Sequence, residues 1–372
     1  METREELYLE HLQDMFGSDE IETYPSEKIE EIIYRLLRFL PNKGKLYKYR
    51  LIDGQAFENA FQSLKEGYIW LANADTLNDD FDTTVNFNPE EVLSSVVNYL
   101  FAHPQELIKW IFNYSLETGE IQWGRGEAEA ELVGRVISCI DRETGKIIIS
   151  EAKNLMLAEG YTSQQTEEYL CKLSSFLENL LSNKEIPEKI AKNFLEINKR
   201  LRKSAFVFSL SAFNNSDTMW AYYAQNNGFC IEYDFNRVNE LSLEKKRLLI
   251  SIYKVIYNDN KPSVSFLDTF KYFLSAYTDK ESLQKSNQEL LSQLITKGIQ
   301  WKHEEEWRIL LFNIENKLYA DIVSAIYVDE STIERQNFIR LKSLAQERNW
   351  KIFVRKKNII GTEHIFEEYT ED

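Results

Sequence analysis

Apolar side chains in the first 40 residues recur three and four positions apart, most clearly in the segment SEKIEEIIYRLLRFL that begins at Ser26. This spacing places them on one face of a helix, so it predicts that residues 1–40 are helical. Pro41 and Gly44 end the helical pattern.

The next block, LYKYRLI at residues 46–52, alternates apolar and polar side chains and predicts a strand. Residues 55–66 show a short amphipathic pattern that ends at Gly67, which predicts a helix. YIWLAN, residues 68–73, predicts a second strand, which the polar stretch NADTLNDD ends. Together they predict a strand–helix–strand unit.

A long segment of different character follows, with helical patterns such as TEEYLCKLSSFLENLLSN and no internal repeat. We interpret residues 89–204 as a helical insertion that offers a surface to a partner protein. The insertion divides an α/β core domain into residues 45–88 and 205–372, and residues 1–44 form a set of N-terminal helices.

The strand pattern returns in FVFSLS, residues 206–211, and a polar turn then leads into the helical sequence TMWAYYAQ. Either Ser216 or Asp217 is a suitable N-cap for that helix. FCIEYDF, residues 229–235, predicts the next strand. Further strands are predicted at 251–257, 307–313 and 322–329, helices at 263–297 and 331–348, and an edge strand in WKIFVRKKN, where Lys and Arg would protect the edge.

The charge balance restricts the partners. The 44 Lys and Arg residues against 60 Asp and Glu give a net charge of −16, which on average repels nucleic acid and anionic membranes. Two short basic clusters, residues 199–203 and 245–247, are typical of solvated helix faces.

Cysteines and histidines are too scattered to form a recognisable site. The three cysteines are widely spaced, which argues against a disulfide framework and a zinc site, and fits a reducing compartment. The four histidines lack the spacing of a helical metal site, so no metal is predicted. Without a signal-peptide pattern or a long apolar run, we expect a cytoplasmic protein that does not enter a membrane.

Three segments carry candidate chemistry. In LYKYR, the tyrosines alternate with charged side chains, and Tyr49 and Arg50 stand at the predicted end of the strand. A guanidinium there could bind a phosphate or carboxylate through two parallel hydrogen bonds. The alternative is a half-exposed strand with its charges in solvent.

In the second segment, Ser209 and Ser211 share one face of a predicted strand. They could orient a ligand and a neighbouring carboxylate, or simply face solvent. The aromatic side chains of the following helix are either core residues or, at Tyr222 and Tyr223, a stacking surface for a flat ring.

The third segment is QWKHEEEWRILLF, where three glutamates lead into an apolar strand. In an extended chain Glu304 and Glu306 share a face with Arg308. Partial burial and mutual repulsion would raise a carboxyl pKa and suit a general base. Solvated acids at the end of a strand are the alternative.

The order of these blocks resembles a bacterial family, the domain of unknown function 2971. The blocks are LYKYR, WLAN, the string at 78–82, FSLS, MWAYYA with GFCIEY, and WKHEEEWR. They cover roughly residues 46–82, 206–235 and 299–328. Asp80 departs from the proline expected at its position. The family name implies no function.

The chain is also similar, in the order and spacing of its elements, to the ADP-ribosyltransferase fold. That resemblance implies an α+β fold with a mixed, largely antiparallel β core and a large helical insertion. It implies NAD as a substrate whose nicotinamide–ribose bond is cleaved through an oxocarbenium-like state. By this match Arg50 holds the diphosphate, Tyr49, Ser209, Ser211 and Tyr222 or Tyr223 complete the NAD site, and Glu304 or Glu306 is catalytic.

Three functions are therefore open. The first is an ADP-ribosyltransferase-like enzyme or NAD glycohydrolase, which the resemblance connects with toxins and antiviral defence effectors. It requires Arg50, the serines and a glutamate to meet in one pocket. The second is a non-catalytic ligand-binding or sensor module on the same fold, which requires only the pocket. The third is an RNA-acting enzyme, which the net charge of −16 disfavours. The acceptor of any transferred group is left open.

Overall fold

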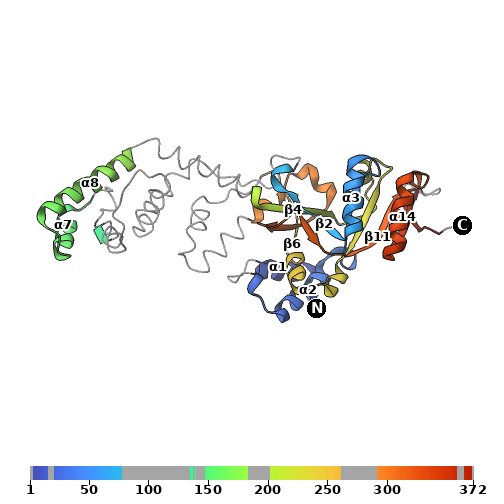
Figure 1. The fold of residues 1–372 in the computed structure, drawn as a ribbon, viewed down its shortest axis with the longest axis horizontal. Helices are drawn as coiled ribbons and strands as arrows, with labels where there is room; N and C mark the ends of the chain where they lie inside the picture. Colours follow the sequence, from blue (N-terminus) through green and yellow to red (C-terminus); the bar gives the residue numbers. More distant parts are fainter. Residues whose placement is uncertain are drawn as a thin grey trace. The chain divides into compact units, whose positions relative to one another are not determined.

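The computed structural model describes residues 3–15, 21–77, 135–136, 139, 147–182, 202–260, 291–357 and 364–370. The chain divides into two compact units (Figure 1). The first comprises residues 1–85, 198–262 and 287–372, and the second comprises residues 86–197 and 263–286. Most of the predicted insertion at 89–204 and of the predicted helix at 263–297 lies outside the described residues.

In the second unit the described part is a helix pair, α7 (Ile149–Ala158) and α8 (Ser163–Ser182). Their apolar side chains meet in a small core that includes Ala152, Met156, Leu170 and Leu173.

The first unit is built on one large sheet with the strand order β13-β12-β11-β5-β1-β4-β9-β6. Its bounds are β1 Lys45–Arg50, β4 Ala205–Ser211, β5 Phe229–Asp234, β6 Ile252–Lys254, β9 Glu306–Phe312, β11 Val323–Asp329, β12 Lys351–Lys357 and β13 His364–Glu368. All pairs along this order are antiparallel except β11 with β12. The predicted α+β class with a mixed, largely antiparallel core is confirmed.

Helices cover both faces of this sheet. An extensive apolar core joins one face to α1 (Arg4–Met15), α2 (Ser26–Phe39), α3 (Gly54–Glu66) and α14 (Gln336–Arg348), with the short α11 (Leu243–Leu249) beside them. A separate cluster packs α10 (Asp217–Ala224) on the tyrosines of β1 and β11. The helices predicted in residues 1–40 and 55–66 are present.

Three predicted strands differ from the structure. The segment 251–257 is two strands, β6 and β7 (Ile256–Tyr257), which pair with β9 and with β8 (Thr296–Lys297) respectively. The segment 68–73 is two strands, β2 (Tyr68–Trp70) and β3 (Ala72–Asn73), which pair with β10 (Lys317–Tyr319) and β4 respectively. The chain changes partner between them. β12 was predicted at a sheet edge, but it lies between β11 and β13. The basic residue Arg355 is accordingly buried and bonded to Asp217 and Asp329.

The sheet opens between β1 and β4. β5 pairs with β1 along all six residues of that strand, whereas β4 pairs with it only at Tyr47 and Ser211. β4 is in register with β9 over its whole length. We call the opening between β1 and β4 the seam. It begins after Tyr47 and runs toward Arg50 at the end of β1.

Candidate functional site

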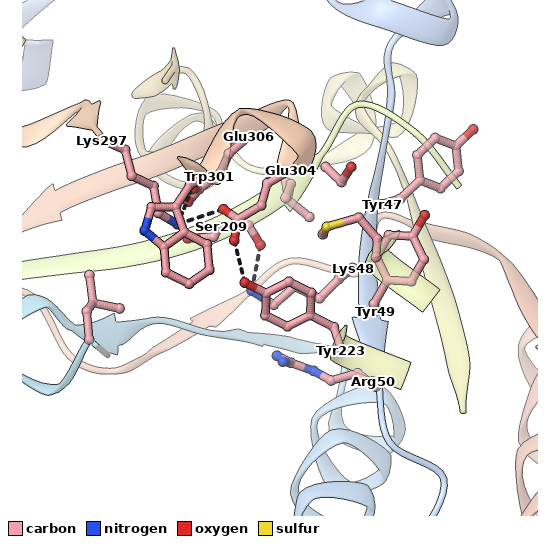
Figure 2. A pocket seen from close by; sticks show the side chains of 14 residues that line it. Tyr47, Lys48, Tyr49, Arg50, Ser209, Tyr223, Lys297, Trp301, Glu304 and Glu306 are labelled. Atoms are coloured by element: carbon pink, nitrogen blue, oxygen red, sulfur yellow. Dashed lines mark hydrogen bonds and ion pairs between the residues drawn. The ribbon is translucent and has the colours of Figure 1, made fainter. Parts of the chain in front are cut away.

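A pocket of about 310 Å³ lies at the seam, within the first unit (Figure 2). Residues 47–50 of β1 and 209–211 of β4 form two of its walls. The remaining lining comes from α10, from the 3₁₀ helix η6 (Ile299–Glu304), from the ends of two strands and from Leu77. These residues are Leu77, Met219, Tyr223, Lys297, Trp301, Glu304 and Glu306.

Seven of the eight predicted site residues meet in this pocket: Tyr49, Arg50, Ser209, Ser211, Tyr223, Glu304 and Glu306. They come from the three segments that the sequence singled out. Tyr222 does not line the pocket. Its side chain is 73% exposed and its ring stacks at a tilt 5.9 Å from that of His303. Consecutive side chains of a helix point in directions about 100° apart, and Tyr223 takes the pocket side.

The two carboxylates share one cation, Lys297. Its Nζ lies 2.6 Å from Oε2 of Glu304 and 3.1 Å from Oε2 of Glu306. The hydroxyl of Tyr223 donates to the other oxygen of Glu304. All four side chains are drawn together in Figure 2. Because the ammonium lies between the acids, both can be ionised in a buried place.

The surroundings of Glu306 favour its ionised form. Arg308 donates to both its oxygens, from Nε at 2.8 Å and from Nη2 at 3.1 Å. Burial alone would raise the pKa of Glu306, but the charges of Arg308 and Lys297 outweigh it and hold the pKa well below its usual range. A carboxylate of this kind orients its neighbours and is a poor base.

Glu304 differs from Glu306 in its electrostatics. Burial, and next the charge of Glu306, raise the pKa of Glu304 above its ordinary value, although Lys297 and Tyr223 oppose the shift. Its bonds to those two residues leave lone pairs on the carboxylate for a ligand. Glu304 is therefore the better suited of the two to exchange a proton.

The backbone forms a turn between Glu304 and Glu306. η6 ends at Glu304, Glu305 adopts a left-handed conformation with φ of 42°, and β9 begins at Glu306. The prediction of an extended chain from Glu304 onward is therefore wrong, because the strand begins only at Glu306. The turn still brings the Glu304 and Glu306 side chains to the same pocket, and the carbonyl of Glu305 accepts from Ala212 N at 3.0 Å.

Two cations of β1 face the seam, Lys48 and Arg50. Lys48 Nζ donates to the backbone carbonyl of Ser209 at 2.5 Å and lies 4.8 Å from the centre of the Phe208 ring. Among the described residues, no carboxylate forms an ion pair with Lys48 or Arg50. Burial lowers the pKa of Arg50, and burial followed by the charge of Arg50 lowers that of Lys48 well below its ordinary value.

Serine and tyrosine side chains also fix the loop that leads to α10. The hydroxyl of Tyr49 donates to the carbonyl of Phe213 at 2.7 Å, and Ser211 Oγ accepts from the amide of the same residue at 3.2 Å. Ser216 then caps the helix by accepting from Met219 N. These bonds set the position of Met219 and Tyr223 at the pocket.

Sequence patterns did not identify Lys297 or Trp301 as site residues. Lys297 falls in a segment predicted to be helical, but it belongs to β8 (Thr296–Lys297), which pairs with β7 (Ile256–Tyr257). Trp301 stands three residues before Glu304 and lies over the Lys297 ammonium at 4.8 Å. The tryptophans that flank the three glutamates were the available signal.

The described residues hold no group of three His, Cys, Asp or Glu side chains placed to bind a metal ion. Within the same residues, none of the helices has the length and apolar character needed to cross a membrane.

Residues 219–309 match the model of a family described as Protein of unknown function (DUF2971). The resemblance to this family is confirmed. The DUF2971 match runs from α10 to the start of β9, so it includes Tyr223, Lys297, Glu304 and Glu306, whereas β1 and β4 precede it. No curated protein and no solved structure matches the chain.

Proposed function

We propose that this pocket binds NAD and that the protein is an ADP-ribosyltransferase-like enzyme or NAD glycohydrolase. One observation carries the proposal. An arginine with no acidic partner in the described chain, a tyrosine, two serines and a buried carboxylate pair meet in a single pocket, although three separated segments supply them. This convergence is what the enzyme requires and what a simple binding module does not.

Each group has a role in this proposal. The Arg50 guanidinium would hold the diphosphate of the dinucleotide, and the Tyr223 ring would stack on the nicotinamide. A volume of about 310 Å³ is at the lower end for ligand pockets, so it suits the reacting nicotinamide–ribose half of NAD.

In the reaction, the bond between ribose C1′ and the nicotinamide nitrogen breaks, and its electron pair leaves with nicotinamide. The positive charge that develops on the ribose would be stabilised by the Glu304 carboxylate. Glu304 would then take the proton of the acceptor hydroxyl or water as the new C1′–O bond forms. Glu306, bound to Arg308 and Lys297, would keep Glu304 and its partners in place.

A second function has an observation in its favour. Every oxygen of Glu304 and Glu306 already accepts a bond from Lys297, Tyr223 or Arg308. Carboxylates whose oxygens all accept bonds from the protein itself suit a site that binds a ligand without reacting with it, as in a sensor module. The cellular role proposed for the enzyme, a toxin or an antiviral defence effector, would not apply to such a module.

The test is nicotinamide release from NAD by the purified full-length protein. We expect turnover by the wild type and a loss of at least 100-fold in Glu304→Gln, in line with the usual contribution of a general base. Glu305→Gln is the matched control, because its side chain belongs to the same turn without lining the pocket. Circular dichroism and thermal unfolding establish that each variant is folded.

Binding of NAD without turnover would favour the sensor. Equal turnover by Glu304→Gln and wild type would contradict the role of Glu304, and absence of both binding and turnover would contradict the proposed function.

A further inference from the structure

Lys48 is a charged side chain that neither the fold nor the proposed reaction accounts for. Its ammonium lies in the seam, where it bonds to the Ser209 carbonyl and faces the ring of Phe208. An ammonium has three donors, and the bond to the Ser209 carbonyl uses one of them. The other donors are available to a ligand in the pocket that Lys48 lines.

Lys48 and Arg50 are also a pair of like charges. They lie two residues apart on β1, so they emerge from the same side of the strand into one pocket. The acids of that pocket are occupied elsewhere, since Glu306 binds Arg308 and Lys297, and Glu304 binds Lys297. Two neighbouring cations without a counter-ion in the described chain are unfavourable until an anion joins them.

We propose that Lys48 and Arg50 together form a subsite that binds the diphosphate group of a nucleotide. The two side chains differ in what they offer, a point charge from Lys48 and a planar fork from Arg50, and a diphosphate has enough oxygens for both. The identification of the ligand as a nucleotide rests on the proposed function, whereas the phosphate subsite does not.

Binding at this subsite would be coupled to a proton. The charged groups that act on Lys48 are Arg50 on its own strand, Lys297 on β8, Glu304 at the end of η6 and Glu306 at the start of β9. Burial and the neighbouring Arg50 lower the pKa of the free amine, and a bound diphosphate would raise it again. The complex therefore holds more protons than the free protein, so affinity is highest at low pH and falls as pH rises.

The experiment is calorimetric titration of the full-length protein with ADP-ribose at pH 6 and pH 9. The diphosphate diester of this probe does not change its charge in that range, so any change in affinity belongs to the protein. We expect weaker binding at pH 9, and a loss of affinity of about tenfold or more at pH 6 in Lys48→Met, which keeps the length of the side chain. Lys43→Met, an exposed cation just before β1, is the control and should bind as the wild type does.

Inorganic pyrophosphate, titrated at pH 6 only, separates this proposal from the proposed function. If pyrophosphate binds in a Lys48-dependent way and ADP-ribose does not, the phosphate subsite stands and the nucleotide ligand is lost. If ADP-ribose binds equally to wild type and to Lys48→Met, the subsite is overturned, while NAD turnover could still occur. If neither probe binds, the subsite is overturned as well.

Discussion

At the scale of single residues, Arg308 is the most deeply buried charge near the site. Its side chain is 1% exposed, yet it carries a full charge and donates to Glu306 and to the carbonyl of Leu294. Removing one charge of such a pair is costly, because the other stays buried and loses its principal partner.

We therefore predict that Arg308→Met lowers the free energy of unfolding by about 3–5 kcal/mol. The double variant Arg308→Met, Glu306→Gln should recover part of this loss, since it also removes the buried carboxylate, for which Lys297 alone compensates once Arg308 is gone. Urea denaturation of the single and double variants measures both effects. A double variant less stable than Arg308→Met would refute this electrostatic explanation.

Residue patterns predicted part of this site. The i, i+2 spacing of an extended chain predicted that Glu304 and Glu306 lie on one side. Both line the pocket, but a turn at Glu305 brings them there. The alternation in LYKYR could not tell whether the Lys48 side chain faces solvent or lies in the opening between β1 and β4. The answer depends on the seam, where β4 does not pair with the end of β1. The sequence of β1 alone does not show how far another strand pairs with it.

At the scale of elements, α1 is attached to the sheet through a histidine. His11 is fully buried, its Nε2 lies 3.2 Å from the carbonyl of Ile252, and its Nδ1 has no hydrogen-bond partner. The ring packs near Phe39 of α2 and Tyr253 of β6. Burial lowers the pKa of His11 from 6.5 to about 4, and the nearby charges of Asp14 and Arg35 act in opposite directions.

This burial makes the folded protein sensitive to acid. Between pH 6.5 and about 4 the unfolded chain binds a proton at His11 and the folded chain does not, so stability falls as pH falls through this window. The loss is about 3 kcal/mol at most. We predict a flatter stability profile in this window for His11→Gln, whose amide can still donate to Ile252.

Urea denaturation at pH 7, 6 and 5 provides the profile, with His303→Gln as the control histidine variant. A parallel decline of wild type and His11→Gln would exclude His11 as the cause.

Element predictions succeeded where periodicity was long and failed where pairing decided the outcome. The helices α2 and α3 follow their apolar spacing closely. The break between β2 and β3 depends on β10, a partner remote in the sequence. The place of β12 inside the sheet depends on β13, which follows it closely in the sequence and takes the edge position. Side-chain alternation reports that a segment is a strand but does not report its neighbours.

At the scale of the whole molecule, the sequence predicted the α+β class and the region of the candidate site. Strand and helix patterns sufficed for the class. The order of the strands was not predicted. That order brings β1, β4 and β9 together and gathers residues 47–50 and 209–211 with Glu304 and Glu306.

The seam between β1 and β4 also has a mechanical consequence. Five strands, from β13 to β1, lie on one side of it, and β4, β9 and β6 lie on the other, with a single residue pair joining β1 to β4. Under a force applied across the strands, we expect the sheet to separate first between β1 and β4, because these strands share the fewest backbone contacts. Optical-tweezer pulling through handles at Lys254 and Lys356 would show an early low-force step. A ligand that spans the seam should raise the force of that step. Unfolding in a single step would contradict the prediction, because it would show that the two parts of the sheet do not separate at the seam first.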